Sequence, residues 1–330
     1  MRSGFVSLVG RPNAGKSTLL NRLVGSKIAI VADKPQTTRH VIQGVRTGPD
    51  HQIVFLDSPG IQQPRNRLHR RMMREVRAAL DQRDLLVLVL DAAAAFGARD
   101  EQAIELVRSA QAPALVALNK IDRLARKQAL LPLVEAYRQR HSFLEYLPLS
   151  ALTGEGVEAL AEALVSRLPE GPAYFPADHL TDQPLRILAA EWIREKVIQE
   201  TQQEIPHATA VVIDQFRETA RLVRVAATIY VERGGQKGII IGSGGRRLQQ
   251  IGTLARQDLE ALCGRKVFLD LHVKVRPGWR QSESFVDALD WRKQWGAVRE
   301  QAHEGDPTPA GAGDPLAVGG SGDGQGSADR

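Results

Sequence analysis

The chain has 330 residues, of which 43% are hydrophobic and 25% are charged, as is typical of a soluble globular protein with two domains. The sequence shows no N-terminal targeting segment and no apolar run near the roughly 20 residues of a membrane span, so we expect neither. The single cysteine, Cys263, excludes an intrachain disulfide framework and favours a reducing cytoplasm, with the thiol buried in a helix.

The formal net charge of +6 is distributed unevenly along the chain. The window 221–280 holds twelve Lys and Arg against four Asp and Glu, a net of +8, whereas the tail 303–330 has a net charge of −4. A positive segment of this size indicates a polyanionic partner, either a nucleic acid or an anionic membrane surface. Charge alone does not choose between them.

Apolar strand-like runs alternate with amphipathic helical stretches from residue 5 to about residue 168. Several of these runs are apolar throughout, as expected for parallel strands that are buried on both faces. The alternation predicts an α/β domain over residues 1–168, with a doubly wound, mostly parallel sheet that binds ligands at the carboxyl ends of its strands. The expected strands are 5–9, 41–46, 53–56, 85–90, 114–118 and 144–149, and the expected helices include 68–80, 100–110 and 156–168.

Four short motifs begin at the ends of these expected strands. They are GRPNAGKS at 10–17, DSPG at 57–60, NKID at 119–122 and the weak motif LSAL around Ser150 and Ala151. The first motif occurs in many NTPases, and the third selects the base. All four in this order predict a P-loop GTPase that converts GTP and water to GDP and phosphate.

The first motif has the residues of a phosphate-binding loop. Gly10 and Gly15 allow the backbone N–H groups to point at phosphate oxygens, and the helix that begins at Lys16 adds its positive end. Lys16 should bridge the β- and γ-phosphates, and the Ser17 hydroxyl should bind Mg²⁺. The predicted nucleotide-binding residues are Gly10, Asn13, Ala14, Gly15, Lys16, Ser17, Thr18, Asp57, Gly60, Asn119, Lys120, Asp122, Ser150 and Ala151.

Two further segments should respond to the γ-phosphate. Asp57 ends the third expected strand, where it should hold Mg²⁺ through a water molecule, and the Gly60 N–H should contact the γ-phosphate. In the loop 26–40, which ends in PQTTRH, one threonine should close over the magnesium; we choose Thr38 and keep Thr37 as the alternative. The competing interpretation is that both threonines only cap a turn. The predicted magnesium ligands are Ser17, Thr38 and Asp57, and the predicted catalytic residues are Lys16, Thr38, Gly60 and Asn13.

The NKID motif should recognise guanine. Asp122 offers a two-point acceptor for the N1–H and the exocyclic amine, a pair of donors that adenine lacks. Asn119 should fasten this loop to the phosphate loop, and Lys120 should lie along the base. The backbone N–H of Ala151 should donate to guanine O6.

Ile61 follows DSPG, where many GTPases carry the glutamine that orients the attacking water. An isoleucine cannot orient water, so the rate must come from other groups or stay low. Asn13 is the candidate, because its side-chain oxygen would help hold K⁺ beside the β–γ bridge, where a fixed cation offsets charge. The alternative is that Asn13 only supports the loop through hydrogen bonds.

A run of arginines follows the γ-phosphate sensor and begins a helix. A solvated helix face is the simpler interpretation, and a contact surface for RNA or the ribosome is the alternative. The run consists of Arg65, Arg67, Arg70, Arg71 and Arg74.

Residues 169–184 contain four prolines and are predicted to be a linker. A second domain over 185–302 should follow, with an α+β order of helix, two strands, a short helix, a Gly-rich loop, a long helix and a strand. The expected helices are 185–200 and 246–262, and the expected strands are 208–214, 222–232 and 266–275. From residue 303 onward Gly, Pro, Ala and Asp dominate, so we predict that the tail 303–330 is disordered.

The Gly-rich loop in this second domain has the pattern G-x-x-G between two helices. A sugar–phosphate backbone can pack against a loop with no side chains at its ends, and the following helix start and Arg246 and Arg247 add positive charge. Bases should then lie in a groove lined by apolar residues such as Ile240, Ile241 and Ile251. A structural turn in a basic domain is the alternative. The predicted RNA-binding residues are Lys237, Ile240, Ile241, Gly242, Ser243, Gly244, Gly245, Arg246 and Arg247.

With both halves considered, the chain resembles the Era family of bacterial GTPases over about residues 3–298. GRPNAGKS, PQTTRH, DSPG and NKID match the G domain of that family. VERGGQKGIIIGSGGRRLQQIG at 231–252 and VKVRPGW at 273–279 match its C-terminal KH domain, and this is the most specific part.

The resemblance implies a type II KH fold that binds single-stranded RNA near the 3′ end of 16S rRNA and a role in 30S ribosomal subunit biogenesis. It implies GTP, GDP and Mg²⁺ as ligands, K⁺ at Asn13, and nucleotide states that differ in domain arrangement and RNA access. It also implies a cytoplasmic monomer with peripheral association at the inner face of the membrane.

The sequence departs from the family pattern at two places. Ser58 replaces the usual threonine of the DTPG motif, a mild change at a position that is not a ligand. The KH loop commonly contains a lysine, and Ser243-Gly244 removes that phosphate contact, which leaves Arg246, Arg247 and Lys237. We therefore expect RNA binding to persist with an altered affinity.

Two other functions compete with an RNA-coupled GTPase switch. One is an RNA-binding chaperone whose G domain senses nucleotide but barely hydrolyses it, which Ile61 favours. The other is a GTPase that binds anionic lipid through the basic window 221–280. No basic amphipathic helix with an aromatic apolar face supports this last function in the sequence.

Overall fold

The computed structural model describes residues 1–289, apart from 33, 35–36, 62, 82 and 202–204. The predicted tail 303–330 and the end of the predicted second domain lie outside the described residues. Within the described residues, no helix combines the length and the apolar character needed to cross a membrane.

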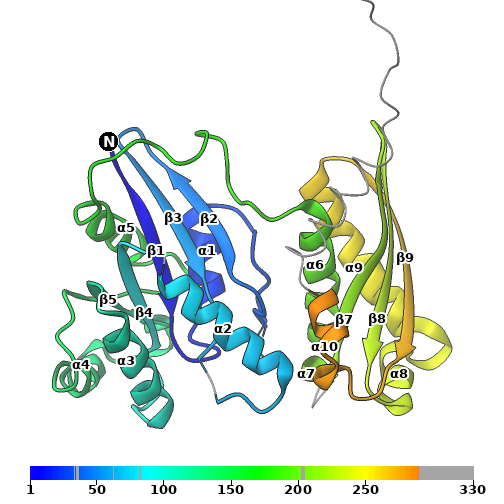
Figure 1. The fold of residues 1–330 in the computed structure, drawn as a ribbon, viewed down its shortest axis with the longest axis horizontal. Helices are drawn as coiled ribbons and strands as arrows, with labels where there is room; N and C mark the ends of the chain where they lie inside the picture. The colour runs from blue at the N-terminus through cyan, green and yellow to red at the C-terminus, as the bar shows by residue number, and fades with distance from the viewer. Residues whose placement is uncertain (33, 35–36, 62, 82, 202–204, 290–330) are drawn as a thin grey trace, which may run out of the picture. The chain divides into compact units, whose positions relative to one another are not determined.

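The first domain is an α/β domain built on a six-stranded sheet (Figure 1). The strand order is β2-β3-β1-β4-β5-β6, and only the β2–β3 pair is antiparallel, so the predicted mostly parallel sheet is confirmed. The central strands are buried on both faces, which explains their continuous apolar sequences. The strands are β1 (Arg2–Val9), β2 (Ile42–Thr47), β3 (His51–Asp57), β4 (Leu85–Asp91), β5 (Ala114–Asn119) and β6 (Tyr146–Pro148).

Helices cover both faces of this sheet. On one face, α1 and α5 contribute Leu20 and Leu160 to a core with Phe55 of β3. On the other face, α2, α3 and α4 contribute apolar side chains such as Ile104 and Tyr137. The helices are α1 (Lys16–Val24), α2 (Arg67–Asp81), α3 (Ala98–Ala110), α4 (Leu130–Arg138) and α5 (Val157–Val165), with short 3-10 helices η1 (Ile121–Arg123) and η2 (Lys127–Ala129).

The predicted linker 169–184 runs along the first domain without a helix or an extended strand. The Thr181 hydroxyl donates to the carbonyl of Gln43 at 2.7 Å, and the Val45 N–H donates to the Leu180 carbonyl at 2.9 Å. The linker is therefore fastened to the edge strand β2 by hydrogen bonds.

The second domain is an α+β unit with a three-stranded sheet of order β7-β8-β9. β7 pairs antiparallel with β8, and β8 pairs parallel with β9, which is the strand arrangement of a type II KH domain. The elements are α6 (Leu185–Glu200), α7 (Ile205–Ala208), β7 (Ala210–Glu218), β8 (Leu222–Val231), α8 (Gly234–Ile241), η3 (Ser243–Gly245), α9 (Arg246–Cys263), β9 (Lys266–Val275), η4 (Trp279–Gln281) and α10 (Glu283–Ala288).

The predicted elements of this domain match the structure except at β7. That strand begins at Ala210 rather than 208, because the short helix α7 occupies the preceding residues, and it continues to Glu218 past an irregularity at Ile213 and Gln215. The apolar faces of α6 and α9 pack on the sheet and bury side chains such as Ile193 and Leu259. Cys263 ends α9 as a partly buried thiol, and burial raises its pKa.

Candidate nucleotide and RNA site

The phosphate loop lies at the carboxyl end of β1 and leads into α1. Lys16 is buried, and its ammonium donates to the carbonyls of Gly10 and Arg11 at 3.2 and 3.1 Å. Burial lowers the pKa of Lys16, although the negative charge of Asp57 acts in the opposite direction. An ammonium that is held among carbonyls in this way is poised to exchange them for phosphate oxygens.

Two glycines allow close packing at this loop, one within it and one in the DSPG segment. Gly15 has a φ of +94°, and a Cβ there would lie 2.2 Å from the carboxamide nitrogen of Asn119. A Cβ on Gly60 would lie 2.7 Å from the Cα of Pro12, so the DSPG segment packs directly on the phosphate loop. A pocket is formed here by the loop, by Gly60, by residues 30–32 and by Thr37 and Thr38.

The three predicted magnesium ligands lie together. The Ser17 hydroxyl donates to Asp57 at 2.6 Å and shares a hydrogen bond with the Thr38 hydroxyl at 2.7 Å. The other carboxylate oxygen of Asp57, Oδ1, is buried and has no hydrogen-bond partner among the described residues. Burial raises the pKa of Asp57 to about 6, partly offset by Lys16 and by the Ser17 hydrogen bond. Two hydroxyls and a buried carboxylate are a donor set that fits Mg²⁺.

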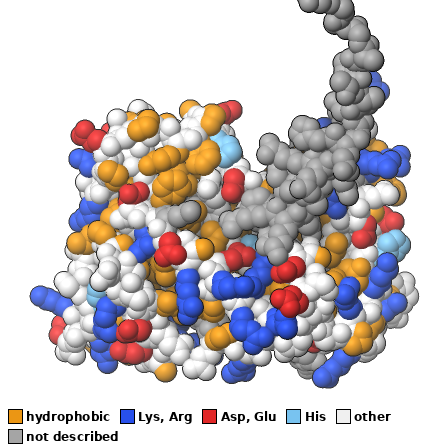
Figure 2. Space-filling view, in the orientation of Figure 1, with side chains coloured by type: hydrophobic (Ala, Val, Ile, Leu, Met, Phe, Trp, Pro, Cys, Tyr) orange, Lys and Arg blue, Asp and Glu red, His pale blue; other side chains and the backbone are white. Residues whose placement is uncertain are grey.

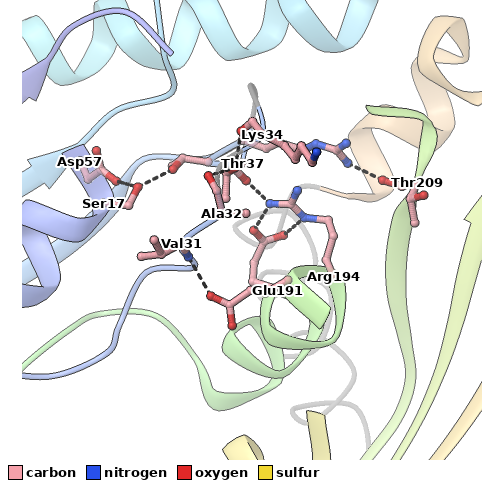
Figure 3. Close-up of polar contacts among 12 residues, drawn as sticks. Ser17, Val31, Ala32, Lys34, Thr37, Asp57, Glu191, Arg194 and Thr209 are labelled. Atoms are coloured by element: carbon pink, nitrogen blue, oxygen red, sulfur yellow. Dashed lines mark hydrogen bonds and ion pairs between the residues drawn. The ribbon is translucent and has the colours of Figure 1, made fainter. Parts of the chain in front are cut away.

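The structure separates the two candidate threonines. The Thr37 hydroxyl donates to the carbonyl of Lys34 at 2.7 Å (Figure 3). The Thr38 hydroxyl instead shares its hydrogen bond with Ser17. The geometry therefore favours Thr38 as the ligand and assigns Thr37 to the local turn.

The guanine loop is joined to the phosphate loop as predicted. The Asn119 carboxamide donates to the Ala14 carbonyl at 2.8 Å, and the Lys120 ammonium donates to the Asn13 carbonyl at 2.6 Å and to Asp91 at 2.8 Å. Asp122 is exposed in η1, where its carboxylate is open to a base.

One detail of this loop differs from the prediction. The Ala151 N–H donates to the side-chain oxygen of Asn119 at 2.9 Å, so it is not a free donor for guanine O6 in this structure. This hydrogen bond forms because Asn119 ends β5 and its carboxamide reaches the loop that follows β6. Ser150 is fully buried, and its hydroxyl accepts from the Thr153 N–H, which shapes the turn.

Ile61 lies 2% exposed in the core under α2 and α3, and its N–H donates to the Gly10 carbonyl. Its side chain is thus directed into the protein, consistent with the prediction that it does not orient water. Asn13 adopts a φ of 64°, and its backbone carbonyl is held by Lys120.

The G-x-x-G loop joins α8 to α9 through η3. Gly244 and Gly245 have positive φ values of +60° and +81°, and the space around their Cα atoms is open. Arg246 and Arg247 donate to the carbonyls of Ser243 and Ile239, so their guanidinium groups brace the loop that they flank.

The predicted lining of the RNA groove is partly wrong. Ile240 and Ile251 are fully buried in the core of the second domain, because these positions of α8 and α9 face the sheet. Ile241 and Lys237 are only partly exposed, and Ile239 is the exposed isoleucine of α8.

An open groove does adjoin the loop, but on α9 and β9. It is lined by Gly245 and by side chains that include Leu248, Arg256, Phe268 and Leu271. Phe268 is 58% exposed, with the Arg224 guanidinium 5.8 Å from its ring centre. Sequence reasoning missed these residues, although exposed apolar positions on the edge strand β9 would have been the signal.

The arginines of α2 divide into two groups. Arg71 is buried and donates to Glu75 and to the carbonyl of Val286, so it has a structural role. Burial would raise the pKa of Glu75, but hydrogen bonds from His40 and Val41 and the charge of Arg71 lower it to about 2. The exposed arginines of α2 line a hollow together with residues of α10. Figure 2 shows Lys and Arg side chains gathered in the lower middle of the view, where Figure 1 draws α2. The exposed arginines are Arg67, Arg70, Arg74 and Arg77.

Residues of the second domain contact the loop that carries Thr38 (Figure 3). Arg194 of α6 donates to the Thr37 carbonyl, and Arg39 donates to the carbonyl of Thr209 at 2.8 Å. Glu195 of α6 accepts from the Val31 N–H at 2.8 Å. The loop is therefore attached to both domains.

These features define a P-loop GTPase joined to a KH domain. A family model described as 50S ribosome-binding GTPase matches residues 5–120, and a KH domain model matches residues 204–280. The chain is 49% identical to GTPase Era of Geobacter metallireducens, covering 88% of this chain and 98% of that one. It is 45% identical to GTPase Era of Staphylococcus haemolyticus, with coverages of 91% and 98%. The chain belongs to the Era family, and it is a GTPase.

Two solved structures resemble most of the chain. One is a variant of Era from Aquifex aeolicus, bound to GDP and AlF₄⁻, with a TM-score of 0.85. The other is Era in complex with MgGDPNP and nucleotides 1506–1542 of 16S ribosomal RNA, with a TM-score of 0.86. Each is 38% identical to this chain, and each match covers 88% of this chain and 99% of the other.

Proposed function

We propose that this GTPase binds the 3′ region of 16S rRNA through its KH domain and acts in 30S subunit biogenesis and rRNA maturation, as a switch set by GTP. The observation that carries the proposal is the open groove beside the G-x-x-G loop, in the same chain as a guanine nucleotide site. The related Era structure that contains 16S rRNA nucleotides and MgGDPNP supports the choice of RNA.

The groove is suited to single-stranded RNA. Gly244 and Gly245 leave open space at the start of α9, where a sugar–phosphate backbone would approach the positive helix end. The exposed ring of Phe268 and the guanidinium of Arg256 would then offer a stacking face and a charge to successive nucleotides.

In the nucleotide site, Ser17, Thr38 and Asp57 would hold Mg²⁺, which neutralises charge on the phosphate oxygens when bound. Lys16 would leave the loop carbonyls and bind the β- and γ-phosphates. Gly60 would donate its N–H to the γ-phosphate, and Asp122 would accept from guanine. With Ile61 in the core, we propose that K⁺ held near Asn13 supplies the remaining charge stabilisation.

The proposal is tested by the affinity of the GDP-bound and GDPNP-bound protein for RNA that ends in the 16S rRNA 3′ sequence. A scrambled RNA at the same salt concentration is the control, because phosphate contacts depend on salt and ignore sequence. Selective binding that changes with the nucleotide is the expected result. Equal binding of both RNAs in both nucleotide states would contradict it.

A nucleotide-sensing RNA chaperone is the second candidate, because the buried Ile61 leaves no side chain to orient water at that position. Hydrolysis that K⁺ and the cognate RNA both stimulate would favour the switch. A rate indifferent to both would favour the chaperone.

For localisation, we propose a cytoplasmic monomer that associates peripherally with the inner face of the membrane. Flotation with anionic liposomes tests the membrane contact.

A further inference from the structure

The loop that carries Thr38 is held from the KH domain by a buried arginine. Arg194 is 1% exposed, lies on α6, and donates to the Thr37 carbonyl. Glu191, one turn earlier on α6, fixes this guanidinium by accepting from both Nε and Nη2. The bond to Thr37 lies directly beside the residue that faces the magnesium site.

We infer that Arg194 is a positioning residue for GTP hydrolysis, through which the KH domain holds Thr38 at the magnesium site. The inference rests on the proposed function of Thr38 as a magnesium ligand. It means that the catalytic site of the first domain is complete only when the second domain is in contact with it. Arg194 touches no reacting atom and acts through the backbone of the loop.

The direction of the Thr38 side chain follows from contacts on either side of it. The carbonyl of Thr37 points to Arg194, and the side chain of Arg39 reaches the carbonyls of Thr209 and His207. With both neighbours fastened to the KH domain, the Thr38 hydroxyl is directed the other way, to Ser17 at 2.7 Å.

A second anchor lies near the start of the loop. The Glu195 carboxylate accepts from the Val31 N–H at 2.8 Å and from the Lys27 ammonium at 2.6 Å. Asp258 of α9 also accepts from Lys27, at 2.9 Å. This anchor holds Val31, and Arg194 and Arg39 hold the residues on either side of Thr38.

The Arg194 contact couples the position of the Thr38 loop to whether the two domains are in contact or apart. Burial alone would raise the pKa of Glu191, but the charge and hydrogen bonds of Arg194 lower it. Removing a partner from a buried charge is costly. The Thr37 carbonyl is one of the acceptors of the Arg194 guanidinium, whose Nη1 has none among the described residues. If the domains separate, Arg194 loses this acceptor and the loop loses its restraint.

The experiment uses the full chain with Arg194→Gln, and it measures single-turnover GTP hydrolysis, the Mg²⁺ concentration for half-maximal rate, and GDP affinity. We expect the rate to fall by about 10- to 100-fold, the magnitude that small misplacements cause, and the Mg²⁺ requirement to rise. GDP affinity should stay the same, because GDP makes no use of Thr38 in this scheme. Arg194→Lys should recover part of the rate.

The matched control is Arg186→Gln. Arg186 also lies on α6 and donates to a backbone carbonyl, but that carbonyl belongs to Ile213 within the KH domain. If both variants lower the melting temperature and only Arg194→Gln changes the Mg²⁺ dependence, the inference holds. Unchanged hydrolysis and Mg²⁺ dependence in folded Arg194→Gln would overturn it.

If Arg194→Gln does not fold, Glu191→Gln serves as the second variant. This substitution removes the negative charge that holds Arg194 in place, and glutamine has nearly the same volume as glutamate. It should raise the Mg²⁺ requirement in the same direction, and a wild-type value would overturn the inference. Failure of the proposed function is distinguished from failure of this inference by the wild-type protein. If the proposed function is wrong, the wild-type protein does not hydrolyse GTP or does not select the 16S sequence.

Discussion

The nucleotide site and the RNA site of this protein are built in opposite ways. The nucleotide site is buried and internally bonded, with Lys16 on loop carbonyls and Asn119 tying two loops together. The RNA site is an open loop and groove in which Gly244 has free space and Phe268 is exposed. Nucleotide binding therefore depends on a few residues with fixed contacts, whereas RNA binding is distributed over a surface.

The sharpest test of this contrast is Lys16→Ala. We expect GTP affinity to fall by about 10³-fold or more, because charge-assisted hydrogen bonds to two phosphates are lost together. Isothermal titration with GTP measures the loss. The KH domain should stay folded, since Lys16 belongs to the first domain, but RNA binding by this variant should no longer change when GTP is added.

Lys127→Ala is the matched control for that variant. Lys127 is an exposed lysine of the same domain that pairs with Glu155, so its removal should leave GTP affinity unchanged. GTP affinity in Lys16→Ala equal to that of Lys127→Ala would contradict the role of Lys16, and RNA binding that still responds to GTP would contradict its place in the switch.

The next effect is a change of base preference in Asp122→Asn. The exposed carboxylate of Asp122 is expected to accept two N–H groups of guanine, and an amide offers only one acceptor. We expect the preference for GTP over XTP to fall by about 10²-fold or more. Competition between the two nucleotides measures it, and an unchanged GTP preference would remove Asp122 from the base site.

A smaller effect is expected in the RNA site from Gly244→Asp. The new carboxylate would occupy the open space where phosphate should lie, so RNA binding should weaken by about 1–3 kcal/mol. Fluorescence anisotropy with the 16S 3′ sequence measures this, and GDP binding checks that the variant is folded.

Gly264→Asp provides a close control for the conformational part of this change. Gly264 has a φ of +61° against +60° for Gly244, and both have open space around them, but Gly264 caps the far end of α9. The two variants should therefore differ in RNA affinity although they share the same backbone strain. Equal affinities would mean that the G-x-x-G loop is not where phosphate binds.

The same contrast explains which parts of the site could be predicted from the sequence. Most of the nucleotide-binding residues lie in motifs that directly follow strands, and the carboxyl ends of parallel strands meet at one edge of the sheet. The motifs therefore predicted that Ser17, Thr38 and Asp57 lie together, as they do in the structure. The acceptor of the Ala151 N–H in this structure, the side-chain oxygen of Asn119, could not be predicted, because the local geometry of two loops brings these groups together.

The RNA groove could not be assigned in the same way. An isoleucine beside a G-x-x-G loop is equally compatible with the core and with a groove, and Ile240 proved to be core because its position on α8 faces the sheet. The contacts of Arg194 were also outside sequence reasoning, since the pairing of α6 with the loop before β2 depends on how the two domains meet. The fold itself followed from the alternation of apolar runs, which is a local property.

The smallest predicted effect concerns the groove as the structure defines it. Phe268→Ala should weaken RNA binding by about 1 kcal/mol, because the exposed ring would stack on one base. The fold should tolerate the change, since the side chain is 58% exposed and lies on the edge strand β9. Leu144→Ala removes a similarly exposed apolar side chain, at 51%, from the first domain and should leave RNA affinity unchanged. If Phe268→Ala binds RNA like the wild type while Gly244→Asp does not, phosphate contacts at the loop dominate and the groove on α9 and β9 contributes little to base recognition.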